Sequence, residues 1–154
     1  MDFDLIDLAD APDLVETCAA WSFGVWGCQS GGSFIGSQAG FVSALLPARQ
    51  AFTVIGRRDG KPAGMASLRA SDFKDRPDLT PWLAAVYVHP DHRRLGLAHA
   101  LVRRVEAEAR LRGHTQLYLI SEHAEALYAD LGWTTFDHVI GSHGPAVLMS
   151  RALT

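Results

Sequence analysis

The chain has 154 residues, of which 48% are apolar and 20% charged, and its formal net charge is −3. This size and composition are typical of one globular domain, so we expect a single domain over residues 1–154. The acidic balance argues against a general nucleic-acid binder, two cysteines are too few for a disulfide scaffold, and no apolar run is long enough to cross a membrane. The N-terminus is acidic, unlike a secretory signal, so we expect a cytoplasmic protein with reduced thiols.

The first half of the chain contains short, weak patterns. A first strand is indicated near residues 3–8, and Pro12 marks the start of a helix that runs to about Trp21. Residues 22–40 are rich in glycine and serine and predict a loop that can hold helical fragments, while residues 41–49 have helical spacing. Residues 53–58 and 63–70 flank Asp59-Gly60, which predicts a hairpin, and residues 72–81 read as a connecting loop.

The second half has stronger patterns. Residues 82–89 are nearly all apolar, which predicts a strand buried on both faces and ended by Pro90. The helix that follows should bury Ala98, Leu101, Val102, Val105 and Ala109, expose Arg103, Glu106, Glu108, Arg110 and Arg112, and stop at Gly113. A strand over 116–120, a short helix over 124–131 and two strands over 134–140 and 146–153 complete the chain.

The turn between the strand at 82–89 and the long helix has the features of an anion site. The first N–H groups of a helix are unpaired and carry partial positive charge. Gly96 allows an anion to approach this backbone closely, and Arg93 and Arg94 add guanidinium groups that suit phosphate. Neither of the two common nucleotide-phosphate motifs occurs in the sequence.

Three stretches of the sequence together resemble the GNAT superfamily of N-acetyltransferases. Arg93-x-x-Gly96-x-Ala98 fits its acetyl-CoA motif, and Ala124-x-x-Leu127-Tyr128-x-x-x-Gly132-Trp133 is similar to a second family signature. The closing stretch 136–153 resembles the last two strands of the family. The resemblance implies an α/β fold (α+β by some schemes), with a central mixed, mostly antiparallel sheet of about six or seven strands and about four helices on both faces.

The resemblance also implies how acetyl-CoA would bind. In the family the pantetheine arm pairs with the strand, and the pyrophosphate lies on the turn and the helix N-terminus. Carried over position by position, the cofactor-binding residues are Val86, Tyr87, Val88, Arg93, Arg94, Leu95, Gly96, Leu97, Ala98, His99 and Ser121. Ser121 departs from the family, in which an asparagine is common at this position.

Tyr128 occupies the position at which the family protonates the leaving thiolate, and a phenol remains protonated at neutral pH. It also shares an apolar stripe with Leu127 and Leu131, which leaves a packing role open. The family's strand glutamate is missing, since Ala84 and Ala85 stand there. Side chains that can replace this base or end a water relay are Asp72, Asp75, Asp78 and His89.

The family therefore implies acetyl transfer to a primary amine by direct attack in a ternary complex. The missing glutamate keeps an alternative open, a non-catalytic acyl-CoA-binding or sensing domain on the same fold. Trp26 and Phe34 are the candidates for the acceptor pocket, but the acceptor itself stays unidentified, as a small molecule or a peptide. We expect no metal, because the seven histidines lack ligand spacing, and no membrane or nucleic-acid partner; a homodimer is plausible from the family.

Overall fold

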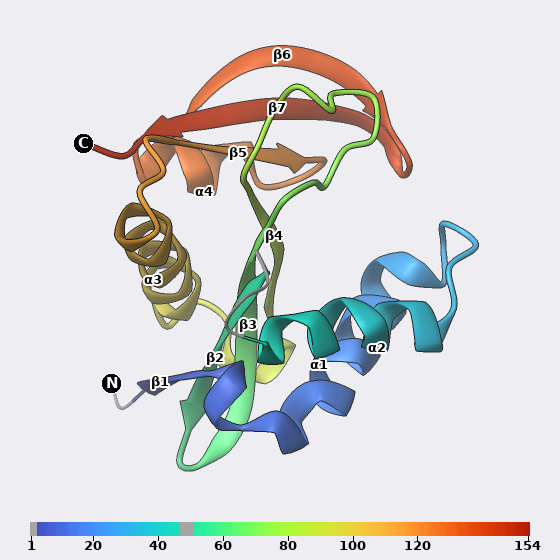
Figure 1. Ribbon diagram of the computed structural model, residues 1–154, viewed down its shortest axis with the longest axis vertical. Helices are drawn as coiled ribbons and strands as arrows, with labels where there is room; N and C mark the ends of the chain where they lie inside the picture. Colours follow the sequence, from blue (N-terminus) through green and yellow to red (C-terminus); the bar gives the residue numbers. More distant parts are fainter. Residues whose placement is uncertain (1–2, 47–50) are drawn as a thin grey trace.

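The computed structural model describes residues 3–46 and 51–154, which form a seven-stranded sheet in the order β1-β2-β3-β4-β5-β7-β6 (Figure 1). The strands are β1 Phe3–Asp7, β2 Phe52–Arg58, β3 Lys61–Arg69, β4 Trp82–Val88, β5 Gln116–Ser121, β6 Thr134–Gly141 and β7 Gly144–Ala152. Neighbouring strands are antiparallel except β4 and β5, which are parallel. The predicted mixed, mostly antiparallel sheet is confirmed.

Helices cover both faces of this sheet, as predicted. The four α-helices are α1 Val15–Ser22, α2 Phe34–Val42, α3 Leu97–Leu111 and α4 Glu125–Asp130. Helices α1 and α2 lie on one face, and α3 and α4 lie on the other (Figure 1). Within the described residues, no helix is both long and apolar enough to cross a bilayer.

The N-terminal helices differ most from the sequence prediction. The loop predicted over residues 22–40 is confined to residues 28–33, and the helical fragments that the prediction allowed take up the rest, because α1 continues into a π-helical turn, Phe23–Gly27, and α2 begins at Phe34. The Ser33 hydroxyl accepts a hydrogen bond from the Gly36 amide at 3.0 Å, and this cap starts α2 within the polar segment. The helix predicted over 41–49 is instead the end of α2 and the 3₁₀ turn Ser43–Leu45; residues 47–50 lie outside the described residues.

The start of α1 also differs from the prediction. Two 3₁₀ turns, Leu8–Asp10 and Pro12–Leu14, precede the helix, which begins at Val15 and not near Pro12. Pro12 is the first residue of the second turn. Proline suits this position because the amide hydrogen that it lacks would have no partner within the turn. The sequence therefore located the segment correctly and misplaced its first α-helical residue.

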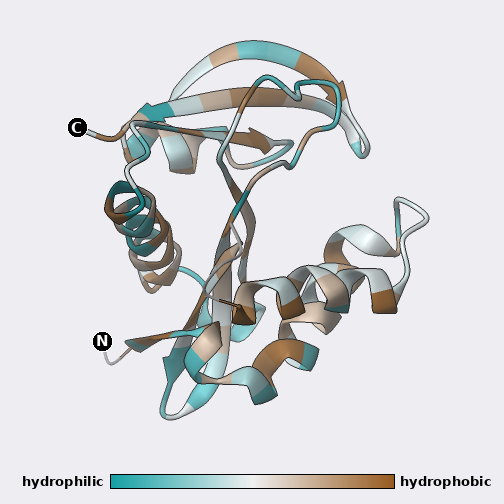
Figure 2. Cartoon of the chain, viewed as in Figure 1, coloured by the Kyte–Doolittle hydropathy of each residue, from teal (hydrophilic) through white to brown (hydrophobic). Residues whose placement is uncertain are grey.

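Helix α3 packs its apolar stripe against the sheet. Leu101, Val102 and Val105 are fully buried, and Figure 2 shows hydrophilic colour on the part of the helix turned away from the sheet. The prediction that Glu106 lies on the outer face is wrong, since it is fully buried. Its carboxylate accepts hydrogen bonds from Trp133 Nε1 at 3.1 Å and from Arg103 at 2.9 Å, which compensates its removal from water.

The sheet separates between its two parallel strands. Strands β4 and β5 are paired only at Trp82 and Tyr118, and Ala85 at φ 53° marks a bulge in β4 opposite the register shift of β3. The strand is buried from Trp82 to Ala84 and half-buried beyond the bulge. The prediction of burial on both faces therefore holds only for the first part of β4, because the second part borders a gap.

Candidate active site

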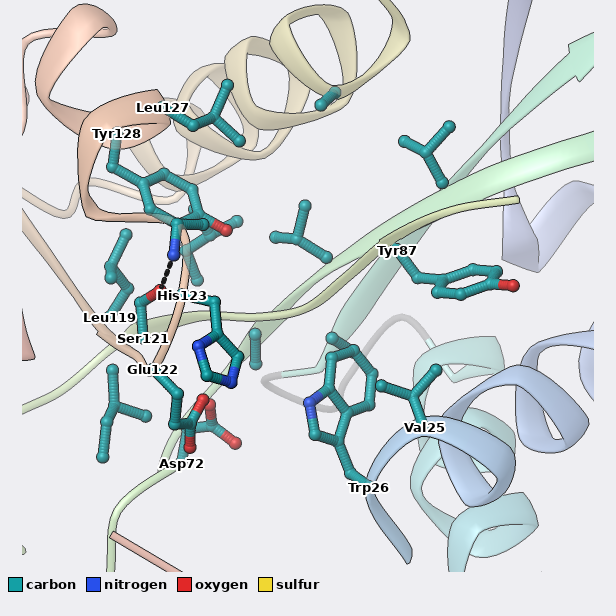
Figure 3. Close-up of a pocket in the computed structure, with 18 of the residues that line it drawn as sticks. Val25, Trp26, Asp72, Tyr87, Leu119, Ser121, Glu122, His123, Leu127 and Tyr128 are labelled. Atoms are coloured by element: carbon teal, nitrogen blue, oxygen red, sulfur yellow. Dashed lines mark hydrogen bonds between the residues drawn. The ribbon is translucent and has the colours of Figure 1, made fainter. Parts of the chain in front are cut away.

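A cavity of about 1500 Å³ lies where β4 and β5 separate (Figure 3). Its walls are the second part of β4, the turn that leads into α3, the end of β5 with α4, the α1 end with the π-helical turn, and the β6–β7 turn. Sites for one small ligand usually hold about 300–1000 Å³. The cavity therefore has room for a long ligand together with a second, smaller one.

Most of the residues predicted to hold the cofactor line this cavity. They come from three separate elements and are Val86, Tyr87, Val88, Arg93, Arg94, Gly96, Leu97, Ala98, His99 and Ser121. Leu95 does not line the cavity in this structure. Their roles in binding stay predictions, but the fold brings the ten residues to one continuous surface.

One arginine side chain and one glycine shape the turn before α3. Arg93 Nε donates a hydrogen bond to the Val88 carbonyl at 2.8 Å, which ties the turn to the end of β4. Gly96 is the N-cap of α3 at φ 85°, a conformation that strongly favours glycine. No side chain caps this helix, so its first N–H groups are free to bind an anion at the cavity wall.

The second part of β4 offers a free backbone edge. On one side Val88 and Tyr87 pair with Gly64 and Met65 of β3. On the other side, among the described residues, β4 pairs with β5 only at Trp82, so the edge from the bulge onward faces the cavity. Such an edge can bind an extended ligand as an added strand does, and its N–H groups can polarise a carbonyl oxygen.

Tyr128 projects from α4 into the cavity. Its ring packs edge-on against Trp133 with 6.2 Å between centroids, while Figure 3 shows the hydroxyl pointing toward the gap between the strands. Burial, and then the charge of Asp72, raises the pKa of Tyr128 above its usual range. The phenol is therefore protonated at neutral pH, and its ring fills the packing role that the sequence also allowed.

Ser121, at the end of β5, lines the cavity but directs its hydroxyl elsewhere. Its Oγ accepts a hydrogen bond from the Ala124 amide at 3.0 Å, drawn as a dashed line in Figure 3. This bond satisfies one of the unpaired N–H groups at the start of α4. Ser121 thus supports the helix that carries Tyr128.

Two carboxylates, Asp72 and Glu122, lie near Tyr128 at one end of the cavity (Figure 3). Asp72 follows β3 and Glu122 follows β5, and the charge of Glu122 acts on Asp72. Asp72 is open to water in the cavity, yet protein atoms surround its carboxyl. Burial of the carboxyl raises the pKa of Asp72 to about 7; the Arg69 guanidinium opposes this shift, and the negative charge of Glu122 adds to it.

The N-terminal helices and the β6–β7 turn meet at the same end of the cavity. His143 Nε2 lies 3.2 Å from the Trp26 carbonyl oxygen, and its Nδ1 lies 3.7 Å from Glu122. Trp26 lines the cavity, as does His143. Phe34, the other predicted acceptor residue, does not line it and packs edge-on against Phe23 with 6.4 Å between centroids.

The structure separates the four candidate bases. Asp72 lines the cavity, whereas Asp75 is an exposed loop residue, Asp78 pairs with Arg76 at 3.0 Å and His89 accepts from the Asp91 amide at 3.2 Å. The last three do not line the cavity.

Sequence reasoning missed Glu122, Arg69 and His143 as cavity residues. The position of Glu122 beside Ser121 was the one available signal. In the described part of the chain no three potential ligand side chains gather as a metal would require, and the expectation of no metal stays a prediction.

Comparisons with known proteins agree with this geometry. A family model described as the acetyltransferase (GNAT) family matches residues 27–133. An aminoglycoside 6′-N-acetyltransferase complexed with coenzyme A is similar in structure, with a TM-score of 0.77 and 15% identity over 100% of this chain and 98% of that chain. The structure of yncA from Salmonella typhimurium with its cofactor acetyl-CoA is also similar. Its TM-score is 0.71 at 21% identity, over 100% of this chain and 94% of that chain.

A third similar structure is the paia N-acetyltransferase from Thermoplasma acidophilum in complex with coenzyme A. Its TM-score is 0.71 at 14% identity, over 99% of both chains. At these identities the likeness of structures shows the fold alone. No curated protein matches the sequence of this chain.

Proposed function

The chain belongs to the GNAT family of acetyltransferases, and on that basis we propose that it transfers the acetyl group of acetyl-CoA to a primary amine by direct attack in a ternary complex. The single observation that carries this proposal is the shared cavity. It joins a free strand edge, an uncapped helix N-terminus, a protonated phenol and a carboxylate within about 1500 Å³.

Acetyl-CoA would lie along the gap in the sheet. Its pyrophosphate would accept hydrogen bonds from the N–H groups at the start of α3, and its pantetheine arm would pair with the free edge of β4. A backbone N–H near Val88 would polarise the thioester carbonyl, because negative charge develops on that oxygen during attack. The acetyl carbon would then lie between Tyr128 and the acceptor end of the cavity.

Tyr128 would serve the leaving group. When the C–S bond breaks, the sulfur carries a negative charge, and a phenol that stays protonated is a suitable hydrogen-bond donor to it. The Tyr128 hydroxyl passes its proton to sulfur and recovers one from the newly acylated nitrogen. This relay leaves the tyrosine unchanged after each turnover.

The alternative, a domain that binds acyl-CoA without catalysis, was motivated by the alanines at positions 84 and 85. Asp72 places a carboxylate in the same cavity, which favours the enzyme. The test is a thiol-release assay with acetyl-CoA and a broad panel of amines, run beside calorimetric titration of CoA. Turnover of an amine supports the enzyme, CoA binding without turnover of any amine supports the sensor, and no CoA binding contradicts both.

A further inference from the structure

The acceptor end of the cavity is acidic on one side and aromatic on the other. Its acidic side is formed by Asp72 and Glu122, and its aromatic side is formed by Trp26 (Figure 3). We propose that the acceptor enters as an aliphatic primary ammonium ion that lies between the two carboxylates, and that Asp72 removes its proton. This inference rests on the proposed function and adds to it a substrate class and a proton acceptor.

The two carboxylates have different partners. Glu122 is held by His143, whose Nδ1 lies 3.7 Å from Glu122 Oε1, and the side chain of Glu122 is 19% exposed. Asp72 has no hydrogen bond or ion pair of this kind among the described residues, and the nearby Arg69 acts on it through charge alone. The proton of the acceptor is therefore better placed on Asp72, while the contact with His143 fixes the position of Glu122.

The Arg69 guanidinium contacts the Phe41 ring of α2. Its guanidinium carbon lies 5.0 Å from the centroid of the Phe41 ring, so the cation stacks on α2. This contact holds Arg69 at the margin of the cavity, where it stabilises the ionised form of Asp72 without bonding to it. The ammonium ion of an acceptor can then approach Asp72 from the cavity side.

The titration of Asp72 fits this role. Its pKa of about 7 means that the carboxylate form dominates above neutral pH and is lost as the pH falls below it. The charged or titratable groups around it are Arg69 on β3, Glu122 and His123 after β5, Tyr128 on α4 and His143 in the β6–β7 turn. A base near the working pH combines a useful ionised fraction with sufficient basicity.

The proton and electron balance of the step is complete. Asp72 takes one proton from R–NH₃⁺, and the freed lone pair attacks the acetyl carbon, which forms the C–N bond and then breaks the C–S bond. The thiolate receives the second nitrogen proton through Tyr128. Asp72 releases its proton to water in the open cavity, so the products are the amide, CoA thiol and one proton.

The charge of this end predicts which amines are accepted. An alkylammonium ion is attracted by both carboxylates, whereas an α-amino acid brings a carboxylate that they repel. An arylamine is neutral at pH 7, so the two carboxylates do not attract it. It also has no ammonium proton for a base to remove. The preference should therefore follow the charge of the acceptor and not only its size.

The experiment uses the full chain, acetyl-CoA and two matched pairs of amines. Butylamine is compared with 2-aminopentanoate, which is the same chain with a carboxylate, and benzylamine is compared with aniline. We expect butylamine and benzylamine to be preferred over 2-aminopentanoate and aniline, respectively, at least about 10-fold in kcat/KM, in line with about 1.4 kcal/mol for one charged contact. Asp72→Asn should lower kcat about 100-fold and remove the decline of the rate below pH 7.

Two further variants complete the design. Glu122→Gln should raise KM for the ammonium acceptors about 10-fold with a smaller effect on kcat. Asp75→Asn is the matched control, because Asp75 lies in the same β3–β4 loop, is exposed and does not line the cavity, so its rates should equal those of the unmodified protein. Thermal unfolding and CoA titration confirm that each variant is folded and still binds the donor.

The outcomes are distinguishable. The ammonium preference together with the loss in Asp72→Asn supports the inference. Amine turnover that ignores acceptor charge, or that survives in Asp72→Asn with an unchanged pH profile, overturns the inference and leaves the proposed function standing. A protein that binds CoA and acetylates no amine in the wider panel overturns the proposed function, and the inference that rests on it.

Discussion

The two ends of the cavity are built in different ways. The donor end consists of β4, the turn over residues 89–96 and the start of α3, and it lies within one continuous stretch of chain. The acceptor end consists of Trp26, Asp72, Glu122 and His143, which come from four separate segments. Trp26 and His143, which meet through a hydrogen bond, are 117 residues apart.

This difference explains what each end can tolerate. The donor end depends on local backbone geometry, a glycine at φ 85° and free helix amides, which a single wrong residue can disrupt. The acceptor end depends on side-chain charge and on contacts between distant segments, each of modest energy. Substitutions at the donor end should abolish binding, whereas those at the acceptor end should change selectivity and rate by degrees.

The largest effect is expected for Gly96→Val. A β-branched residue at φ 85° is strained, and relief of the strain would move the amides that face the pyrophosphate. Loss of two charge-assisted hydrogen bonds, about 4 kcal/mol together, corresponds to about a 1000-fold weaker affinity for CoA. Calorimetric titration with CoA measures this loss.

The control for Gly96→Val is Gly60→Val. Gly60 has a similar φ of 77° in the β2–β3 hairpin and, like Gly96, open space where a Cβ would be. Both variants should lose similar stability in thermal unfolding, and only the Gly96 variant should lose CoA affinity. Equal CoA affinity in the two variants would contradict the anion site at the start of α3.

The next effect, by size, is expected for Tyr128→Phe. The phenylalanine ring keeps the contact with Trp133, but the proton relay to sulfur is lost, so kcat should fall about 100-fold. The affinity for acetyl-CoA should change less than about 3-fold, because the loss of one neutral hydrogen bond costs only about 0.5–1.5 kcal/mol of binding free energy. Steady-state thiol release and CoA titration separate the two quantities.

Tyr118→Phe is the matched control for Tyr128→Phe. Tyr118 packs against Phe136 with 6.1 Å between ring centroids and does not line the cavity, so its variant should keep the full rate. An unchanged kcat in Tyr128→Phe would return that tyrosine to the packing role alone.

The smallest effect is expected for His143→Ala. It removes the hydrogen bond with the Trp26 carbonyl at 3.2 Å and the support of Glu122, each worth about 1 kcal/mol at most. KM for the acceptor should rise about 5-fold while CoA affinity is unchanged. His138→Ala, an exposed position in the same hairpin, is the control, and equal KM values in the two variants would remove His143 from the acceptor end.

Particular residues show where prediction from the sequence succeeded and where it did not. The α3 stripe was predicted correctly at Leu101, Val102 and Val105, since helical periodicity reports burial against a sheet. Glu106 was misplaced because its burial depends on Trp133 and Arg151, which arrive from elsewhere in the chain. The extent of the helices within residues 22–40 was underestimated because their glycines and serines have low helix propensity, which packing of α1 against α2 overrides.

The sequence by itself determined the strand–turn–helix of the donor end, because this depends on neighbours along the chain, and its resemblance to the GNAT family implied the fold class and the place of Tyr128. Tertiary structure alone decided that Asp72, and not Asp75 or Asp78, reaches the cavity, and that Glu122 lies near it. The physical reason is that the β3–β4 loop and the segment after β5 meet at the cavity, and local patterning carries no information about which loop side chains meet there.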